Sequence, residues 1–123
     1  MNKDYEKAFM KAYHHGDDLL EVARKEVADK TREEVLASIS PEWDYYRREG
    51  EKMLERTKAI YRKAGATEEE IRTHSFDRVR INPIDKLKLR WFLHRTHRMW
   101  RKVMPLQGLA AAVNLRARET SER

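Results

Sequence analysis

The sequence predicts an all-α protein, a small bundle of about five to six helices with a long basic helix near residues 83–104. Three observations predict this fold class. The chain has only four glycines and three prolines, too few for the many tight turns of an all-β domain. Charged residues make up 39% of the chain, as expected of helices with solvated outer faces. Apolar residues recur at spacings of three and four.

A chain of 123 residues is expected to form a single helical domain, here over residues 1–118, with residues 119–123 as a frayed tail. It contains no cysteine, which excludes disulfides and thiolate metal sites and is typical of a cytoplasmic protein. No apolar run approaches the roughly 20 residues that a membrane span needs. We therefore expect a cytoplasmic protein with no membrane partner.

The first helix is predicted over residues 3–15. One face carries apolar residues at the i, i+3, i+4, i+7 and i+8 positions of a buried helix face, namely Tyr5, Ala8, Phe9, Ala12 and Tyr13. Gly16 is expected to end this helix, because glycine accepts the left-handed backbone found at many helix ends. An aspartate, Asp17 or Asp18, then caps the second helix.

A break is predicted near residue 30. The apolar face of the second helix does not stay in phase beyond Val27, and Thr31 with Glu34 has the spacing of a capping box. The segment is therefore expected to form two short helices, over about 18–29 and 32–39, or one helix with a sharp bend.

Another helix is predicted from Ser40, which would cap it, and Pro41, which would occupy its first turn. It should continue to Gly65. Its apolar residues recur in a heptad pattern, which continues to residue 64 and includes Trp43, Tyr46, Gly50, Met53, Thr57 and Ile60. Packing inside a monomeric bundle explains this seam, and self-association of two copies along it is the alternative.

The remaining helices are predicted from their caps. Thr67 and Glu70 form a second capping box before a short helix near residues 68–75. Residues 76–82 read as an extended linker. Asn82 and Pro83 then begin the basic helix, which should stop before Pro105 because proline cannot continue the hydrogen-bond ladder. A last helix is expected over residues 109–118.

The positive charge of the chain is concentrated in the basic helix and the linker before it. Residues 77–102 hold nine lysines and arginines against two acids, a balance of +7, whereas the whole chain carries +6. On a helical wheel, one arc of this helix is apolar and is predicted to face the core, with Phe92 and Trp100 pointing inward; it comprises Leu89, Phe92, Leu93, Thr96, Met99, Trp100 and Val103.

The opposite arc is basic and carries an aromatic ring, Trp91, with Ile84 and Leu87 close to it. Cations neutralise phosphates, and an aromatic ring stacks on an exposed base. The leading hypothesis is a non-enzymatic module that binds DNA or RNA through phosphate contacts, mostly independent of sequence. Its predicted site residues are Lys88, Arg90, Trp91, His94, Arg95, His97, Arg98, Arg101 and Lys102.

Three other interpretations account for a basic helix face. In the first, the charges are simply solvated and are partly neutralised within the chain. In the second, the helix lies on an anionic membrane or resembles a calmodulin target. The third is a protein–protein adaptor or inhibitor, such as a phage- or plasmid-type regulator, that docks on a larger nucleic-acid-handling complex. A homodimer is compatible with the nucleic-acid and adaptor hypotheses.

No catalytic or metal site is predicted, and no cofactor. His94 and His97 have a chelating i, i+3 spacing, but arginines flank them and no carboxylate lies near in sequence. The run "HHGDD" at residues 14–18 spans a helix junction, and "DYYRR" at residues 44–48 has no companion base. The sequence also lacks phosphate-binding glycine loops, so we expect the chain not to be an enzyme.

Overall fold

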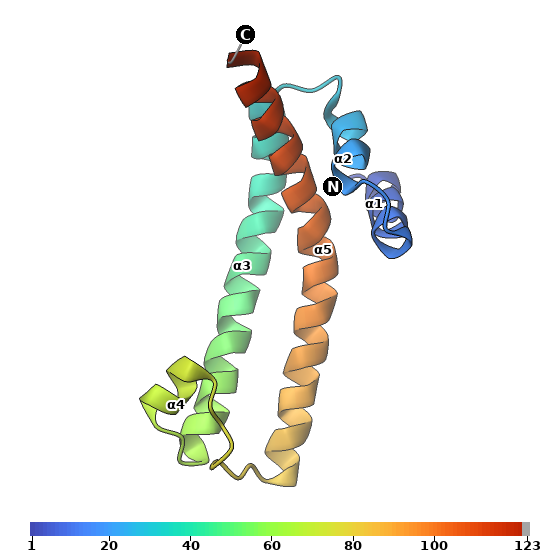
Figure 1. Ribbon diagram of the computed structural model, residues 1–123. Coiled ribbons are helices and arrows are strands. Elements are labelled where there is room, and N and C mark those ends of the chain that lie inside the picture. Colours follow the sequence, from blue (N-terminus) through green and yellow to red (C-terminus); the bar gives the residue numbers. More distant parts are fainter. Residues whose placement is uncertain (122–123) are drawn as a thin grey trace. The chain divides into compact units, whose positions relative to one another are not determined.

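The computed structural model describes residues 1–121, and within them the chain forms five α-helices and no strand, which confirms the predicted all-α fold class (Figure 1). Residues 122 and 123 lie outside the described residues. None of the helices in residues 1–121 is long and apolar enough to cross a bilayer. The helices are α1 (Lys3–His15), α2 (Leu19–Val27), α3 (Arg32–Lys63), α4 (Glu68–Thr73) and α5 (Pro83–Ser121).

The chain divides into two compact units. Unit 1 consists of Met1–Tyr46 and Trp100–Arg123, and unit 2 consists of Arg47–Met99. Both α3 and α5 therefore contribute one part to each unit. That residues 1–118 act as a single domain stays a prediction.

The core of unit 1 forms where α1, α2 and the first part of α3 pack around the last part of α5. Figure 1 shows α1 and α2 beside this part of α5. The hydroxyl of Tyr5 donates a buried hydrogen bond to the Pro105 carbonyl at 2.7 Å. The buried cluster consists of Tyr5, Phe9, Ala23, Val27, Val35, Ile39, Leu106, Leu109, Ala112 and Val113.

Most helix boundaries of unit 1 follow the predicted capping residues. Gly16 adopts a left-handed φ of 73° after α1, and the Asp18 carboxylate accepts the backbone N–H of Leu20 at 3.0 Å. Thr31 and Glu34 form the expected capping box, with bonds of 3.1 and 3.4 Å, so the predicted break near residue 30 is confirmed.

The predicted helix break at Ser40 is wrong, because α3 continues through Pro41 without interruption. Leu36, Ile39 and Trp43 lie at i, i+3 and i+7 and line one pocket, so a single helix keeps this apolar stripe in phase across the proline. The Pro41 side chain is exposed, and the carbonyl that loses its partner four residues earlier can bind water.

The predicted helix end before Pro105 is also wrong, because α5 runs through Pro105 and Gly108 to Ser121. Pro105 and Leu106 are buried against α1, and this packing outweighs the hydrogen bond that the proline removes. No separate helix therefore exists over residues 109–118. Residues 119–121 of the predicted frayed tail belong to α5, and the rest of that tail lies outside the described residues.

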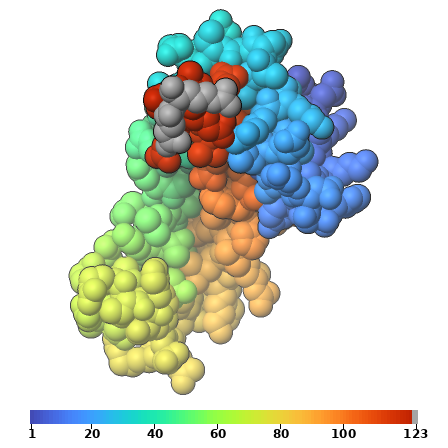
Figure 2. All heavy atoms as spheres, turned by 45° about the horizontal axis from the view of Figure 1, so that its top comes forward, coloured from blue at the N-terminus to red at the C-terminus, as the bar shows by residue number. Residues whose placement is uncertain are grey.

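Unit 2 is built from the second part of α3, α4, the linker and the first part of α5, with the two long segments antiparallel (Figure 1). Met53, Ile60 and Ile71 are its buried apolar residues. The ring of Tyr61 stacks on Phe76 with centroids 3.8 Å apart. Figure 2 shows the atoms of α4 (yellow) gathered beside the end of the α3 segment (green).

The short helix α4 and the linker after it are held by one arginine. Thr67 and Glu70 form the predicted capping box of α4, which ends at Thr73. Arg78 of the linker donates two hydrogen bonds to the Glu70 carboxylate, at 2.6 and 3.1 Å, and one to the Gly65 carbonyl at 2.9 Å. The Arg78 bonds, with the cap of the helix, lower the pKa of Glu70 to about 2.

Candidate nucleic-acid interface

The basic segment begins at a firmly anchored helix start in unit 2. The Asn82 side chain accepts the backbone N–H of Asp85 at 2.8 Å and donates to the Asp85 carboxylate at 2.9 Å. Lys63 of α3 donates to the same carboxylate at 3.3 Å. Burial raises the pKa of Asp85, but the hydrogen bond and charge of Lys63, with Asn82 and Lys88, outweigh it and leave that pKa lowered.

The face of α5 that packs inside the protein is narrower than the predicted apolar arc. Leu89, Phe92, Met99 and Val103 are half-buried, as predicted. Leu93 and Trp100 are 58% and 51% exposed, so the prediction that they face the core is wrong. Leu93 is exposed because in unit 2 a single long helix segment, from α3, lies along α5, and a helix with one neighbour buries only a narrow stripe.

Six predicted site residues lie exposed in unit 2, and one of them, Lys88, lies near Asp85. The other five are here called the outer face: Arg90, Trp91, His94, His97 and Arg98. Trp91 is 57% exposed, and its ring lies 6.5 Å from that of His94. Within residues 1–121, neither Arg90 nor Arg98 has an ion-pair partner. Lys86 is a further exposed cation of this segment without an ion-pair partner there, and the sequence hypothesis did not include it.

Three of the predicted cations have acidic neighbours. The Arg95 guanidinium is half-buried and donates to Glu49 of α3 at 3.1 Å. The Lys88 ammonium lies 3.8 Å from Asp85 and remains largely exposed. Lys102 belongs to unit 1, where it donates to Glu6 at 2.6 Å, and this bond raises the pKa of Lys102. Arg101 also lies in unit 1 and is exposed.

The Glu49 partner of Arg95 could not be recognised from the sequence. The two residues are 46 positions apart, and no local spacing relates them. The short-range contact of Lys88 with Asp85 has an i, i+3 spacing that a sequence can reveal.

The residues of the predicted self-association seam are divided between the units. Trp43 and Tyr46 belong to unit 1, and the other four belong to unit 2. Met53 and Ile60 are buried inside unit 2, and Gly50, Met53 and Thr57 line an open groove. Self-association along the seam stays a prediction.

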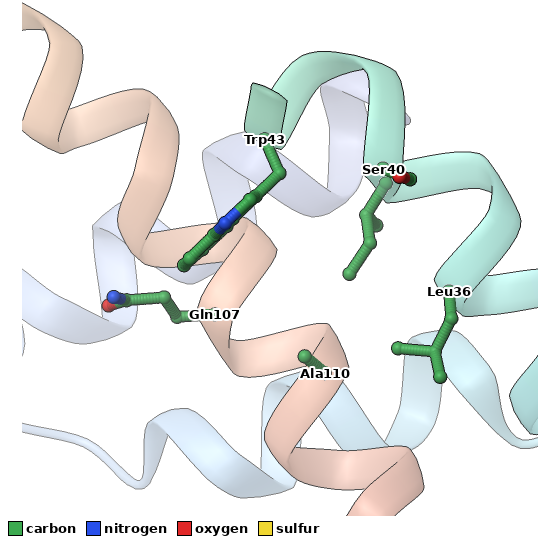
Figure 3. Close-up of a pocket in the computed structure, with 6 residues that line it drawn as sticks. Leu36, Ser40, Trp43, Gln107 and Ala110 are labelled. Atoms are coloured by element: carbon green, nitrogen blue, oxygen red, sulfur yellow. The ribbon is translucent and has the colours of Figure 1, made fainter. Parts of the chain in front are cut away.

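A separate pocket of about 390 Å³ lies in unit 1 between α3 and α5. Figure 3 shows the Trp43 indole reaching from α3 toward Gln107 of α5, with Leu36 and Ala110 on the remaining wall. The polar groups on its lining residues are those of Ser40, Gln107 and the Trp43 indole N–H. This composition offers no charged group to hold a nucleotide or a metal.

Among residues 1–121, no group of three or more histidine, aspartate or glutamate side chains is arranged to hold a metal ion. Comparisons with known proteins give no relative for this chain: no family model matches it, and no curated protein or solved structure is significantly similar. The function must therefore be argued from the site alone.

Proposed function

We propose that unit 2 is a nucleic-acid-binding module that contacts phosphates through the outer face of α5. The observation that carries the proposal is the combination of Arg90 and Arg98, both without intramolecular counter-ions in the described residues, with the exposed ring of Trp91. Guanidinium groups bind phosphate oxygens, and an exposed indole stacks on a base.

The distribution of charge supports the same proposal. Unit 2 contains fifteen lysines and arginines against eight aspartates and glutamates, a balance of +7. The rest of the chain holds twelve against thirteen, a balance of −1. The entire positive excess therefore belongs to the unit that carries the outer face, where it attracts a polyanion.

The strength and salt dependence of binding follow from the cations that remain available. With Arg95 and Lys102 occupied by glutamates, about three phosphates can be engaged by Lys86, Arg90 and Arg98. The logarithm of affinity should then fall against the logarithm of salt concentration with a slope of about −2 for a single strand and about −3 for a duplex.

Fluorescence anisotropy with labelled single-stranded DNA, single-stranded RNA and duplex DNA at rising salt tests the proposal. Reversing Arg90 and Arg98 to glutamate should lower affinity at least tenfold without changing the unfolding midpoint. Lys7→Glu with Lys11→Glu is the matched control, because both lysines are exposed on α1 in unit 1 and the change in net charge is identical. Equal losses from the two double variants would contradict a site on α5.

A second candidate function rests on a different observation, the exposure of Ile84 and Leu87 at 68% and 64%. Together with Trp91 they lie at i, i+3 and i+7, the spacing of anchors that insert into a groove of a partner protein. The cations beside them favour a groove with an acidic rim. The chain would then be an adaptor.

The anisotropy experiment separates the two candidates. Absence of binding to all three oligonucleotides at about 0.1 M salt, where charge interactions still act over about 10 Å, excludes the first. The adaptor predicts instead that Leu87→Ser abolishes capture of a specific protein from nuclease-treated extract, while the double reversal of Arg90 and Arg98 only weakens it.

A further inference from the structure

We infer that the groove between α3 and α5 in unit 2 is the contact surface for a second copy of this chain. The groove has a volume of about 480 Å³. It is lined by Gly50, Met53, Leu54, Thr57, Tyr61, Leu89, Phe92, Leu93 and Thr96. This inference concerns the face formed by α3 with α5, and it goes beyond the proposed function of the outer face.

The groove is more apolar than its residue types imply. The Thr57 hydroxyl donates to the Met53 carbonyl of its own helix at 2.8 Å, and the Thr96 hydroxyl donates to the Phe92 carbonyl at 2.8 Å. Both hydroxyl donors are thus satisfied within their helices. The groove suits an apolar helix surface better than a polar small molecule.

Two leucines project beside this hollow. Leu54 of α3 is 50% exposed and Leu93 of α5 is 58% exposed, although both line the groove. The same surface therefore offers protruding side chains and a depression formed by smaller residues. A surface of this kind can pack against its own copy, as a two-fold symmetric interface requires.

Gly50 is otherwise unexplained within the chain. A Cβ atom built there meets no atom within 4 Å, and the residue has ordinary helical backbone angles. Glycine in the middle of a helix costs about 0.5–1 kcal/mol relative to alanine. Close approach of a second copy to this part of the groove explains why residue 50 is a glycine. The contacts within the described residues do not explain it.

Charge and area are consistent with a second copy at this face. The exposed rim on α3 carries the ion pairs Arg47–Glu51 and Lys58–Glu55, in which cations are matched by acids, whereas two outer faces, with Arg90 and Arg98, would repel each other. Each 17-residue helix segment is about 25 Å long, and two side by side present about 500 Å². Two such faces bury about 1,000 Å², the lower limit of specific interfaces, which predicts a weak, reversible dimer.

Two antiparallel helix pairs packed face to face form a four-helix bundle. Sedimentation equilibrium of the full chain is expected to show a monomer–dimer equilibrium that does not weaken when salt is raised from about 0.1 M to about 0.5 M. Nucleic-acid binding has the opposite salt dependence, so the two interactions are distinguished directly. A monomer at all concentrations up to about 1 mM would overturn the inference and leave the groove to a different partner.

Variants locate the contact. Leu54→Glu with Leu93→Glu should weaken dimerisation at least tenfold. The control Ile84→Glu with Leu87→Glu changes two residues of α5 that are more exposed and do not line the groove, and it should leave dimerisation unchanged. Gly50→Leu adds a side chain to the groove at a position where a Cβ meets no atom of the monomer within 4 Å, and it should also weaken the dimer. Equal effects of the groove and control pairs, or a full-strength Gly50→Leu dimer, would reject this surface.

Discussion

The guanidinium of Arg95 donates a hydrogen bond to the Glu49 carboxylate at 3.1 Å, and the glutamate side chain is only 15% exposed. This bond joins α5 to α3 inside unit 2. It withdraws one cation from the surface that the basic segment offers to an anionic partner. The affinity of that surface for an anionic partner is therefore set partly by Glu49, an acid on a neighbouring helix.

Replacing Glu49 with glutamine should strengthen nucleic-acid binding. Arg95 would be released to a phosphate, and one more contact steepens the salt slope by about 0.7–0.9. The free energy of unfolding should fall by no more than about 1 kcal/mol, because the arginine is partly solvated. Anisotropy titrations and urea denaturation measure both. Glu51→Gln is the control, since Glu51 pairs with Arg47 on its own helix; an equal gain from it would speak against a specific release.

Substitution of Trp91 by alanine should weaken binding to single-stranded oligonucleotides by about 5- to 150-fold, because stacking contributes about 1–3 kcal/mol for each base. Thermal unfolding should change little, since the ring is 57% exposed. Trp100→Ala removes a comparably exposed tryptophan from unit 1 and should leave binding intact. Similar losses from both variants would mean that Trp91 has no special part in recognition.

Alanine should have opposite effects at two glycines. At Gly108 the added Cβ would lie 2.7 Å from the buried Phe9 ring and 3.0 Å from the Tyr5 hydroxyl, so we expect a net loss of about 1–2 kcal/mol. At Gly50 nothing obstructs the Cβ, and helix propensity should add about 0.5–1 kcal/mol. Denaturation at low protein concentration compares the monomers. Destabilisation by Gly50→Ala would show that the groove is tighter than described.

The link between Glu70 and Arg78 should persist in acid. The pKa of the Glu70 carboxyl in the folded protein, about 2, lies below the ordinary value of 4.5. The contribution of this pair to stability is therefore complete above pH 4.5 and is lost as the pH falls toward 2. The carboxyl carbon shift of Glu70, followed by NMR, should titrate near pH 2. In Arg78→Ala the titration should move toward 4.5, because the largest cause of the shift has been removed. An unmoved midpoint would assign the shift to the helix cap instead.

Local capping signals predicted helix starts well, because a cap depends on residues within one turn. Asp18, Thr31 and Thr67 each act where the sequence places them. The two prolines misled the prediction for the same reason. The local cost of each proline was correctly identified. It is outweighed by tertiary packing, that of Ile39 and Tyr46 in the core on either side of Pro41 and that of Leu106 against α1.

The candidate site was predictable only as a pattern on one helix. The wheel correctly placed Trp91 and Arg98 outward, because they lie opposite the apolar arc. It could not show that α5 has one long neighbour in unit 2, and so it wrongly buried Leu93. It also could not reveal Glu49 as the partner of Arg95, since that contact depends on how α3 and α5 are aligned.

Arg116 donates to the carbonyls of Val27 and Lys30, at 2.8 and 2.6 Å, across 89 and 86 positions of sequence. Unit 1 thus joins a segment that precedes residue 47 in the sequence to one that follows residue 99, whereas unit 2 is continuous from Arg47 to Met99. During translation, unit 2 is complete before the ribosome has made the segment that finishes unit 1. Limited proteolysis of ribosome-arrested chains of increasing length should therefore show protection of the middle of the protein before protection of its beginning.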